Sequence, residues 1–408
     1  MPGLGFPPSL ELLVAAGRLS FARSEARAAI PIEPPDWLAI PAAAQRHGMS
    51  AWLAKAMRGW PGVPDDVKGT VDVTARAQAA RALRAVAELA HVVTQLDAAG
   101  ISPVVLKGPL FSQWLYGDVG ARRFADLDLF IRRSDLLRAT ELLRESGYRL
   151  PAGMTTGVAS TIFAGVGAWP MVHQDLIPLD LHWRSQASRF GSLFEAGELL
   201  RDGFNVAVAG VPIRIPAPSH AAALAVVHAA KHLWASLELV LAIAHLIERD
   251  DVDWGRVEGI ARRAQAWAGA AAGLVLASEL FEREMPAPLR RRPLPAAVSV
   301  LRSAARGFLA MPRVEDSPRA AEWRAHHAAL DTSAGRVRYT LSRLVAPTPL
   351  EWEWCRLPDA LAPLYAGVRL VRLSLAGLRR PFAQRKNALA PRQSSSSDTA
   401  PQSTPQNQ

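Results

Sequence analysis

The chain has 408 residues, half of them hydrophobic, which is enough for two or three structural units with cores of their own. Lys and Arg outnumber Asp and Glu by 47 to 37, and the net charge of +10 would suit a nucleic-acid or anionic-membrane partner. The basic residues are scattered rather than clustered, so we favour Arg-rich helix surfaces, and a nucleic-acid partner is not indicated. The single cysteine, Cys355, excludes an intramolecular disulfide and any multi-cysteine metal site.

The start of the chain and its most apolar stretch both favour a cytoplasmic protein. The first residues, Met-Pro-Gly, are not followed by a basic segment, so no signal peptide is predicted. Residues 221–247 are the most apolar stretch, but they include two histidines, a lysine and a glutamate. That many polar side chains predict a buried helix rather than a transmembrane one.

Residues 1–99 are expected to be helical. Residues 35–57 predict two short helices that meet at His47 and Gly48. Apolar residues recur about every 3.6 positions over residues 71–99, which predicts a long helix, and Gly100 is suited to ending it.

The next segment alternates between short strands and helices. Residues 103–106 predict an apolar strand, followed by a short helix to Tyr116 and a strand over residues 126–131. Ser134 is expected to cap a helix that ends near Gly147. Further strands or hairpins are expected at residues 148–150, 160–166 and 169–183, where Pro178 indicates an edge strand or a bulge.

The pattern returns to helix from residue 216, with Ser219 as the expected N-cap. Residues 290–295 are typical of a linker, and helices with proline breaks follow to about residue 382. The last residues lack large apolar side chains, so they are expected to be disordered.

Two aspartates stand out in this order. Asp126 and Asp128 are two residues apart on a predicted strand, so their side chains project from the same face, where a divalent metal would compensate their charges. Asp180 lies on a later strand that alternates apolar and polar residues in the same way. Three carboxylates on adjacent strands can bind two Mg²⁺ ions and a nucleoside triphosphate. The alternative is that Asp126 and Asp128 are solvated on an edge strand and Asp180 lies in a loop.

Basic residues flank the aspartates. Gly108 suits a turn from strand to helix, where backbone N–H groups face an anion, while Lys107 and Arg122 would neutralise phosphate charge. The alternative is that Gly108 only forms a turn and that Arg122 pairs with Asp118 or Asp126. The absence of a G-x-x-x-x-G-K-[ST] pattern excludes a Walker-type phosphate loop.

His228, Lys231 and His232 share one face of a predicted helix. A zinc site is not favoured, because the HExxH glutamate is absent and Lys231 would repel a cation. Either these residues face the cleft and contact the phosphate or base, or the histidines are partly buried structural residues.

Trp352, Trp354 and the Arg-rich residues 361–380 predict an amphipathic basic element. Weak peripheral contact with an anionic membrane is one interpretation. We favour the other, in which the helix packs on the body of the protein with its arginines outward.

The combined pattern resembles a known family. The segments L-K-G at residues 106–108, D-L-D-L at 126–129, D-L-H-W at 180–183 and H-A-A-K-H-x-W at 228–234 resemble the uncharacterised bacterial nucleotidyltransferase family, a divergent branch of the polymerase-β-type superfamily. The resemblance covers most of the chain and implies an α+β fold with a small mixed sheet between helices. It implies that Asp126 and Asp128 are the paired metal-binding aspartates and Asp180 the third carboxylate.

We therefore expect five parts. These are a helical N-terminal region (1–99), a nucleotidyltransferase catalytic core (100–188), a helical domain that completes the cleft (189–290), a helical C-terminal region (291–384) and a disordered tail (385–408).

The leading hypothesis is an Mg²⁺-dependent transfer of an NMP group from an NTP, such as ATP, to an unidentified acceptor. The residues expected to bind the metal and to act in catalysis are Asp126, Asp128 and Asp180. The residues expected to bind the nucleotide are Lys107, Gly108, Arg122, His228, Lys231 and His232. One alternative is a toxin-like enzyme that modifies tRNA or a protein, and would arrest growth on expression. Another is a catalytically silent nucleotide-binding or scaffold protein of a biosynthetic cluster. The oligomeric state is not predicted.

Overall fold

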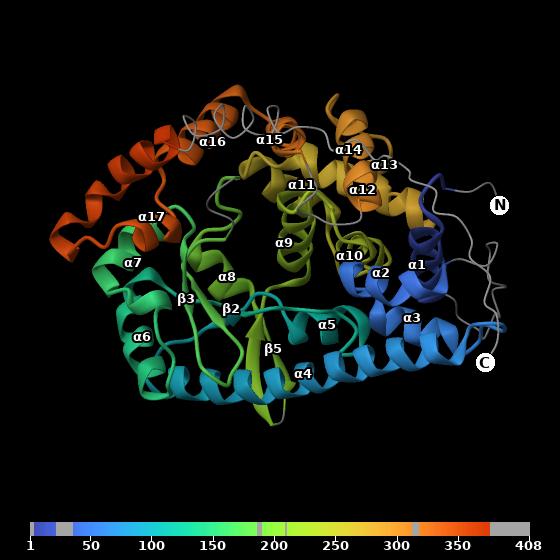
Figure 1. Cartoon of the computed structure of the whole chain (residues 1–408), viewed down its shortest axis with the longest axis horizontal. Helices are drawn as coiled ribbons and strands as arrows, with labels where there is room; N and C mark the ends of the chain where they lie inside the picture. The colour runs from blue at the N-terminus through green and yellow to red at the C-terminus, as the bar shows by residue number, and fades with distance from the viewer. Residues whose placement is uncertain (1–3, 22–35, 186–189, 209, 312–317, 376–408) are drawn as a thin grey trace, which may run out of the picture.

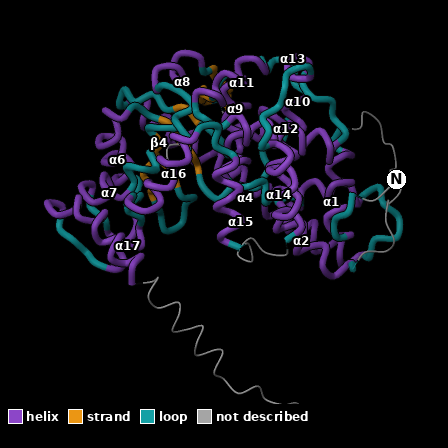
Figure 2. The backbone as a smooth tube through the Cα atoms, turned by 90° about the horizontal axis from the view of Figure 1, so that it is seen from above, coloured by secondary structure: helices purple, strands orange, loops and turns teal. Residues whose placement is uncertain are grey.

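A computed structural model of the chain describes residues 4–21, 36–185, 190–208, 210–311 and 318–375. The α+β prediction is confirmed, because helices surround a four-stranded mixed sheet and a separate two-stranded hairpin. Figure 2 shows the strands together on one side of the molecule, enclosed by helices. None of the described helices is long and apolar enough to cross a membrane.

The N-terminal region is helical, as predicted. It contains α1 (Pro8–Leu19), η1 (Trp37–Ala39), α2 (Ile40–His47), α3 (Ser50–Met57) and α4 (Asp65–Ala98). Gly48 joins α2 to α3 with a φ of 69°, a left-handed conformation that glycine adopts at little cost. The long helix begins six residues before its predicted start, at Asp65, where two aspartates favour the first turn. In Figure 1, α4 runs along the lower edge of the molecule beneath the sheet.

The sheet has the strand order β1-β2-β4-β3. Its strands are β1 (Val104–Val105), β2 (Leu127–Phe130), β3 (Ala168–Met171) and β4 (Leu179–His182). The two central strands, β2 and β4, are parallel, and both outer pairs are antiparallel. The helices between them are α5 (Pro109–Tyr116), η2 (Arg133–Asp135), α6 (Leu136–Glu145), η3 (Pro151–Gly153) and α7 (Thr156–Ile162).

The position of β4 corrects one prediction. Pro178 was expected to mark an edge strand or a bulge, but β4 lies inside the sheet between β2 and β3. Pro178 precedes the strand, and its carbonyl accepts the Leu127 N–H at 2.9 Å. A proline at this point removes no donor from the hydrogen-bond ladder, so it is compatible with a central strand.

Two predicted strands near residues 148–166 are wrong. Residues 160–166 belong to the end of α7 and a turn, because Thr155 caps that helix by accepting the Val158 N–H at 3.2 Å. The predicted strand at residues 148–150 is only an isolated bridge between Arg149 and Val172.

Neither of the two serines predicted as N-caps caps its helix in the structure. Ser134 lies within η2, and α6 begins at Leu136 without a side-chain cap. The later helix, α9, begins at Pro218, so Ser219 lies within its first turn and accepts the Asp253 N–H at 2.9 Å instead.

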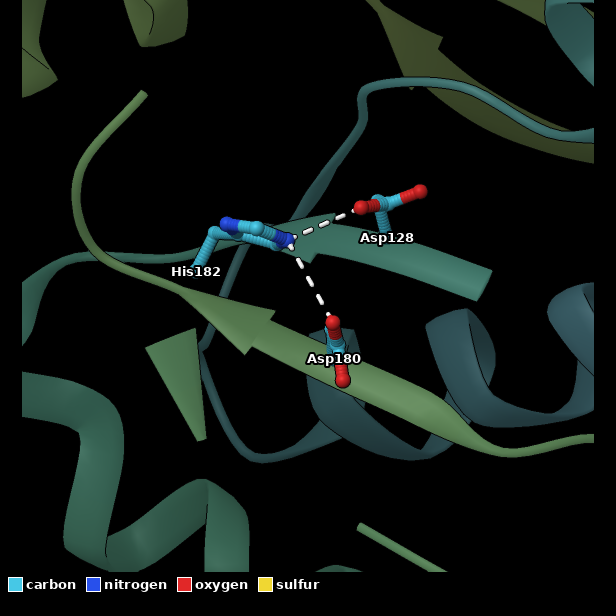
Figure 3. A group of neighbouring side chains, drawn as sticks. All are labelled: Asp128, Asp180 and His182. Atoms are coloured by element: carbon cyan, nitrogen blue, oxygen red, sulfur yellow. Dashed lines mark hydrogen bonds and ion pairs between the residues drawn. The ribbon is translucent and has the colours of Figure 1, made fainter. Parts of the chain in front are cut away.

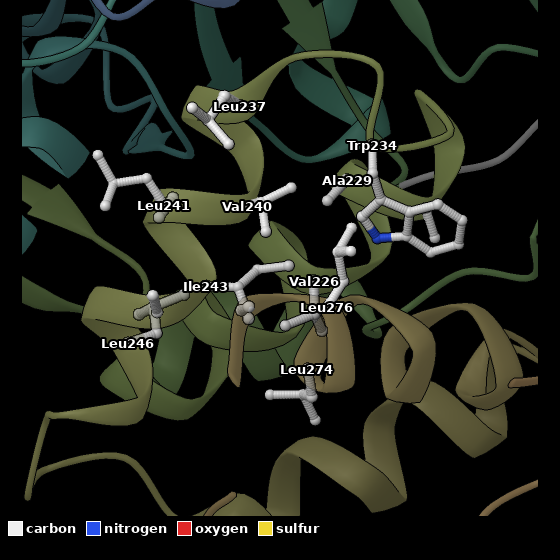
Figure 4. Close-up of a cluster of buried hydrophobic side chains, with 14 of the residues drawn as sticks. Val226, Ala229, Trp234, Leu237, Val240, Leu241, Ile243, Leu246, Leu274 and Leu276 are labelled. Carbon is white, nitrogen blue, oxygen red and sulfur yellow. The ribbon is translucent and has the colours of Figure 1, made fainter. Parts of the chain in front are cut away.

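After the four-stranded sheet the chain is mostly helical. It comprises α8 (Ala196–Asp202), the hairpin of β5 (Phe204–Val208) and β6 (Val211–Ile215), α9 (Pro218–Lys231), α10 (Leu237–Ile247), α11 (Trp254–Arg263) and α12 (Trp267–Phe281). Side chains from α9, α10 and α12 interdigitate in a large core around Trp234, shown in Figure 4. The apolar stretch at residues 221–247 is thus buried, as predicted, but it forms two helices, α9 and α10, rather than one.

The C-terminal helices form an arc along the top and side of the molecule in Figure 1. They are α13 (Ala287–Arg290), α14 (Val298–Ala310), α15 (Arg319–Ala328), α16 (Ser333–Val345), α17 (Pro349–Trp354) and η5 (Asp359–Leu364), with helical residues continuing to 375. The predicted disordered tail, 385–408, lies outside the described residues.

The expected outward arginines of the C-terminal helix are not found in its described part. Arg369 is buried, and Arg372 donates a hydrogen bond to the fully buried Glu351 at 2.6 Å. Leu370 and Val371 are exposed instead. This part of the helix therefore turns arginines towards the body, because a buried carboxylate requires a cation.

Candidate active site

Two carboxylates face each other across the central strands of the sheet. Asp128 on β2 is the register partner of Asp180 on β4, and the two strands are parallel. The alternating residues Leu127, Leu129 and Leu181 are fully buried on the other face of the sheet. This packing fixes the direction of both aspartates, since neighbouring residues of a strand point to opposite faces.

Asp128 is held by two donors. Asp128 is only 3% exposed. Its Oδ1 accepts hydrogen bonds from Lys107 Nζ and His182 Nε2, each at 2.9 Å. Burial alone would raise the pKa of this carboxyl, but Lys107 and His182 together hold it well below its usual range. Asp128 is therefore ionised, and its Oδ2 accepts no hydrogen bond from any residue that the structure describes.

Asp180 is in a different electrostatic state. Burial raises the pKa of its carboxyl to about 6, with further contributions from Asp128 and Asp126, although the nearby His182 opposes the shift. His182 Nε2 lies 4.0 Å from Asp180 Oδ2. Figure 3 shows both side chains on the same side of the sheet, joined by a dashed line. A carboxyl with a pKa of about 6 can both lose and regain a proton near neutral pH.

Asp126 lies just before β2 rather than within it. Its side chain is half-buried, and burial followed by the charge of Asp128 raises its pKa. The solvated-edge interpretation is therefore wrong for this group of aspartates, since Asp128 is buried on an internal strand and Asp180 also lies in a strand.

The donor set fits a divalent cation. Asp128, Asp180 and His182 each offer a ligand atom, and these atoms lie within 4.8 Å of one another. Carboxylate oxygens suit Mg²⁺, whereas an added imidazole nitrogen also suits transition metals such as Mn²⁺. In the described part of the chain, no group of this kind includes Asp126. His182 is a site residue that was not predicted from the sequence, although it follows Asp180 at the two-residue spacing that places both on one face.

All nine predicted site residues line one cavity of about 650 Å³. Its acidic side is formed by Asp126, Asp128 and Asp180. The other predicted residues around it are Lys107, Gly108, Arg122, His228, Lys231 and His232. The polar residues that line the cavity and were not predicted are Arg46, Arg123, His182, Ser185, Ser236 and Glu238.

The turn at Gly108 has the predicted form. Gly108 has φ 80° and ψ −148°, a conformation essentially restricted to glycine, and Pro109 is the first residue of α5. Gly108 lines the cavity, so the beginning of α5 lies next to it. Helix N-termini favour anions because their first N–H groups have no partner within the helix.

Arg122 pairs with a residue far along the chain. Its Nε donates to Glu238 Oε1 on α10 at 2.8 Å, so the alternative pairings with Asp118 and Asp126 are wrong. Asp118 pairs with Lys55 instead, at 2.9 Å. Glu238 was visible in the sequence only as a charged interruption of the most apolar stretch.

Basic residues of α9 and its C-cap line the same cavity as the acidic residues of the sheet. The rings of His228 and His232 have their centroids 4.4 Å apart. Burial, with the charges of Lys107 and other cations, holds the pKa of His228 well below its ordinary value, so this ring is neutral. No group of potential metal ligands in the described residues includes either histidine, so the geometry gives no zinc site here.

The comparisons with known proteins agree with this arrangement. The model of a family described as an uncharacterised nucleotidyltransferase matches residues 33–282, which include the sheet, α9, α10 and every residue of the cavity named above. Neither the curated proteins nor the solved structures include a match to the chain.

Proposed function

Since the chain belongs to this uncharacterised nucleotidyltransferase family, we propose that it transfers an NMP group from an NTP, with ATP as the first candidate, to an acceptor hydroxyl or phosphate. An acceptor oxygen bonds to the α-phosphorus, the bond to the bridging oxygen breaks, and pyrophosphate leaves. The observation that carries this proposal is the pairing of Asp128 and Asp180 on parallel central strands, beside a cavity with basic residues on its other sides.

Asp126, Asp128 and Asp180 would hold two Mg²⁺ ions. His182 is added to these ligands because its ring nitrogen lies close to Asp128 and Asp180. When bound, the metal would neutralise charge on the triphosphate. The Asp180 carboxylate accepts the proton of the acceptor hydroxyl, a role supported by its position beside Asp128 at the same cavity. The half-buried Lys107 compensates the charge of Asp128.

The phosphate groups of the nucleotide are assigned to the basic side of the cavity. Gly108 offers backbone at the beginning of α5, and Arg122 offers a guanidinium. Lys231, His228 and His232 approach from α9. In this proposal residues 100–188 carry the chemistry and residues 189–290 close the cavity. Contact of the C-terminal helix with a membrane stays a prediction.

The test is transfer of label from an α-labelled NTP to components of a cell extract in the presence of Mg²⁺. We expect Asp126→Asn and Asp128→Asn each to reduce label transfer at least about 100-fold, because each removes a charge on which nucleotide binding and reaction depend. Asp251→Asn is the matched control, since Asp251 is an acid outside the cavity that pairs with Arg249. Transfer that survives both cavity substitutions would refute the proposal.

A further inference from the structure

Glu238 and Arg122 form an ion pair that is almost completely buried at the cavity wall. The residues are 5% and 9% exposed. Both carboxylate oxygens of Glu238 are used, because Oε1 accepts from Arg122 Nε at 2.8 Å and Oε2 accepts from the Arg123 N–H at 3.2 Å. The guanidinium carbon of Arg122 also lies 5.6 Å from the ring centroid of Phe111. These contacts hold the Arg122 side chain on two sides.

The terminal nitrogens of Arg122 are left available. Nη1 and Nη2 donate no hydrogen bond to any residue in the described ranges, although the residue lines the cavity beside Lys107 and Asp128. A guanidinium has five N–H donors, and among the described residues only the Nε donor of Arg122 has a hydrogen-bond partner. A planar fork with free terminal donors matches two oxygens of a phosphate group.

The carboxylate of Glu238 is itself supported by the N-terminal helices. A Cβ atom at Gly48 would lie 2.1 Å from Glu238 Oε2, so the turn between α2 and α3 packs directly on this side chain. The start of α10 is bonded to the same turn, because Ser236 Oγ donates to the His47 carbonyl at 2.8 Å and the Leu237 N–H donates to His47 Nδ1 at 3.3 Å. Three separate segments of the chain therefore meet at Glu238.

We propose that Glu238 is a positioning residue that orients Arg122 towards a phosphate group of the bound nucleotide. Glu238 does not contact the nucleotide in this proposal, which rests on the proposed function. The buried carboxylate compensates the charge of Arg122 and fixes its Nε edge, so that the terminal nitrogens are directed to the ligand before it binds. The turn at Gly48 extends this support to the N-terminal helices.

The direct test is calorimetric titration of the protein with Mg²⁺ and α,β-methylene-ATP, which requires no acceptor. Glu238→Gln keeps the volume of the side chain but removes its charge, and we expect the Kd to rise about 10–100-fold. Glu258→Gln is the matched control. Glu258 is a buried glutamate on α11 that pairs with Arg262 and Arg292 and does not line the cavity. This variant should lose stability without a change in Kd.

Two further variants separate positioning from general loss of structure. Glu238→Asp keeps the charge in a shorter side chain, so it should fold and weaken binding by an intermediate factor. Combining Glu238→Gln with Arg122→Gln should weaken binding no more than Arg122→Gln does alone, because Glu238 acts through Arg122.

The outcomes distinguish this inference from the proposed function. An unchanged Kd in Glu238→Gln and Glu238→Asp, with weaker binding in Arg122→Gln, would overturn the positioning role and leave the proposed function standing. Additive losses in the double variant would overturn it too. A wild-type protein that binds no nucleotide would overturn the proposed function itself.

Discussion

At Asp128 the structure places a cation, an imidazole and a second carboxylate around one buried side chain. Lys107 and His182 both donate to Oδ1, and Asp180 lies across the sheet. A buried carboxylate without such donors would be neutral at pH 7. The donors from β4 and from the end of β1 therefore keep Asp128 charged, and its other oxygen is the atom best suited to a cation.

His182 is expected to contribute to metal affinity, because it bonds to Asp128 and lies 4.0 Å from Asp180. We predict that His182→Ala weakens Mn²⁺ binding about 10–100-fold, the range seen when residues that orient metal ligands are removed. Electron paramagnetic resonance of free Mn²⁺ measures this without any assay of activity. His91→Ala, an exposed histidine on α4, is the control. Equal Mn²⁺ affinity in wild type and His182→Ala would show that His182 has no part in the site.

At the scale of the elements, the site depends on strand register and on one helix junction. The parallel pairing of β2 with β4 brings Asp128 and Asp180 together across 52 positions of the chain. The junction of α2, α3 and α10 places Glu238 behind Arg122. A shift of either strand by one residue would turn its aspartate into the core.

The junction predicts a dependence of stability on pH. Burial, with a smaller effect of Arg46, lowers the pKa of His47 to about 3, and its Nδ1 accepts the Leu237 N–H. In the unfolded chain His47 binds a proton near pH 6.5, whereas in the folded chain it does so only near pH 3. The contribution of neutral His47 to the free energy of unfolding is therefore complete above pH 6.5. It is lost as the pH falls from 6.5 towards 3, by about 1.4 kcal/mol for each pH unit.

The measurement is urea unfolding at pH 7 and pH 5 of the wild type and of His47→Asn, whose amide oxygen can replace Nδ1 as an acceptor. We expect the unfolding free energy of the variant to fall less between the two pH values than that of the wild type. The same pH dependence in both proteins would show that His47 does not cause the loss of stability at low pH.

The sequence pattern predicted the helices and strands better than it predicted which residues pair with one another in the fold. Alternation along residues 126–131 and 177–184 correctly indicated strands with aspartates on one face, and the turns at Gly48 and Gly108 were also predicted. The predicted strand at residues 160–166 was wrong, because the cap at Thr155 starts a helix that composition alone did not reveal. The sequence pattern could not indicate that Arg122 pairs with Glu238, since these residues are 116 positions apart and join only in the tertiary fold.

At the scale of the whole molecule, the cavity lies where the sheet meets the helical half. Its acidic residues come from β2, β4 and the segment before β2, while α9 and α10 supply basic residues and Glu238. The net charge of +10 is consistent with an anionic substrate such as a nucleotide. Composition could not distinguish this from arginines at helix surfaces, because the cations of the cavity are dispersed in the sequence and converge only on folding.

In the proposed reaction the NMP group of an NTP moves to an acceptor with the help of Asp128 and Asp180. The most direct measurement incubates the protein, Mg²⁺ and cell extract with ATP labelled at the α-phosphate or, in parallel, at the γ-phosphate. For transfer of an NMP group we expect α-label on the acceptor, γ-label in the released pyrophosphate, and loss of both signals in Asp128→Asn. Label from the γ-phosphate on the acceptor, or α-label transfer that is unchanged in Asp128→Asn, would contradict it.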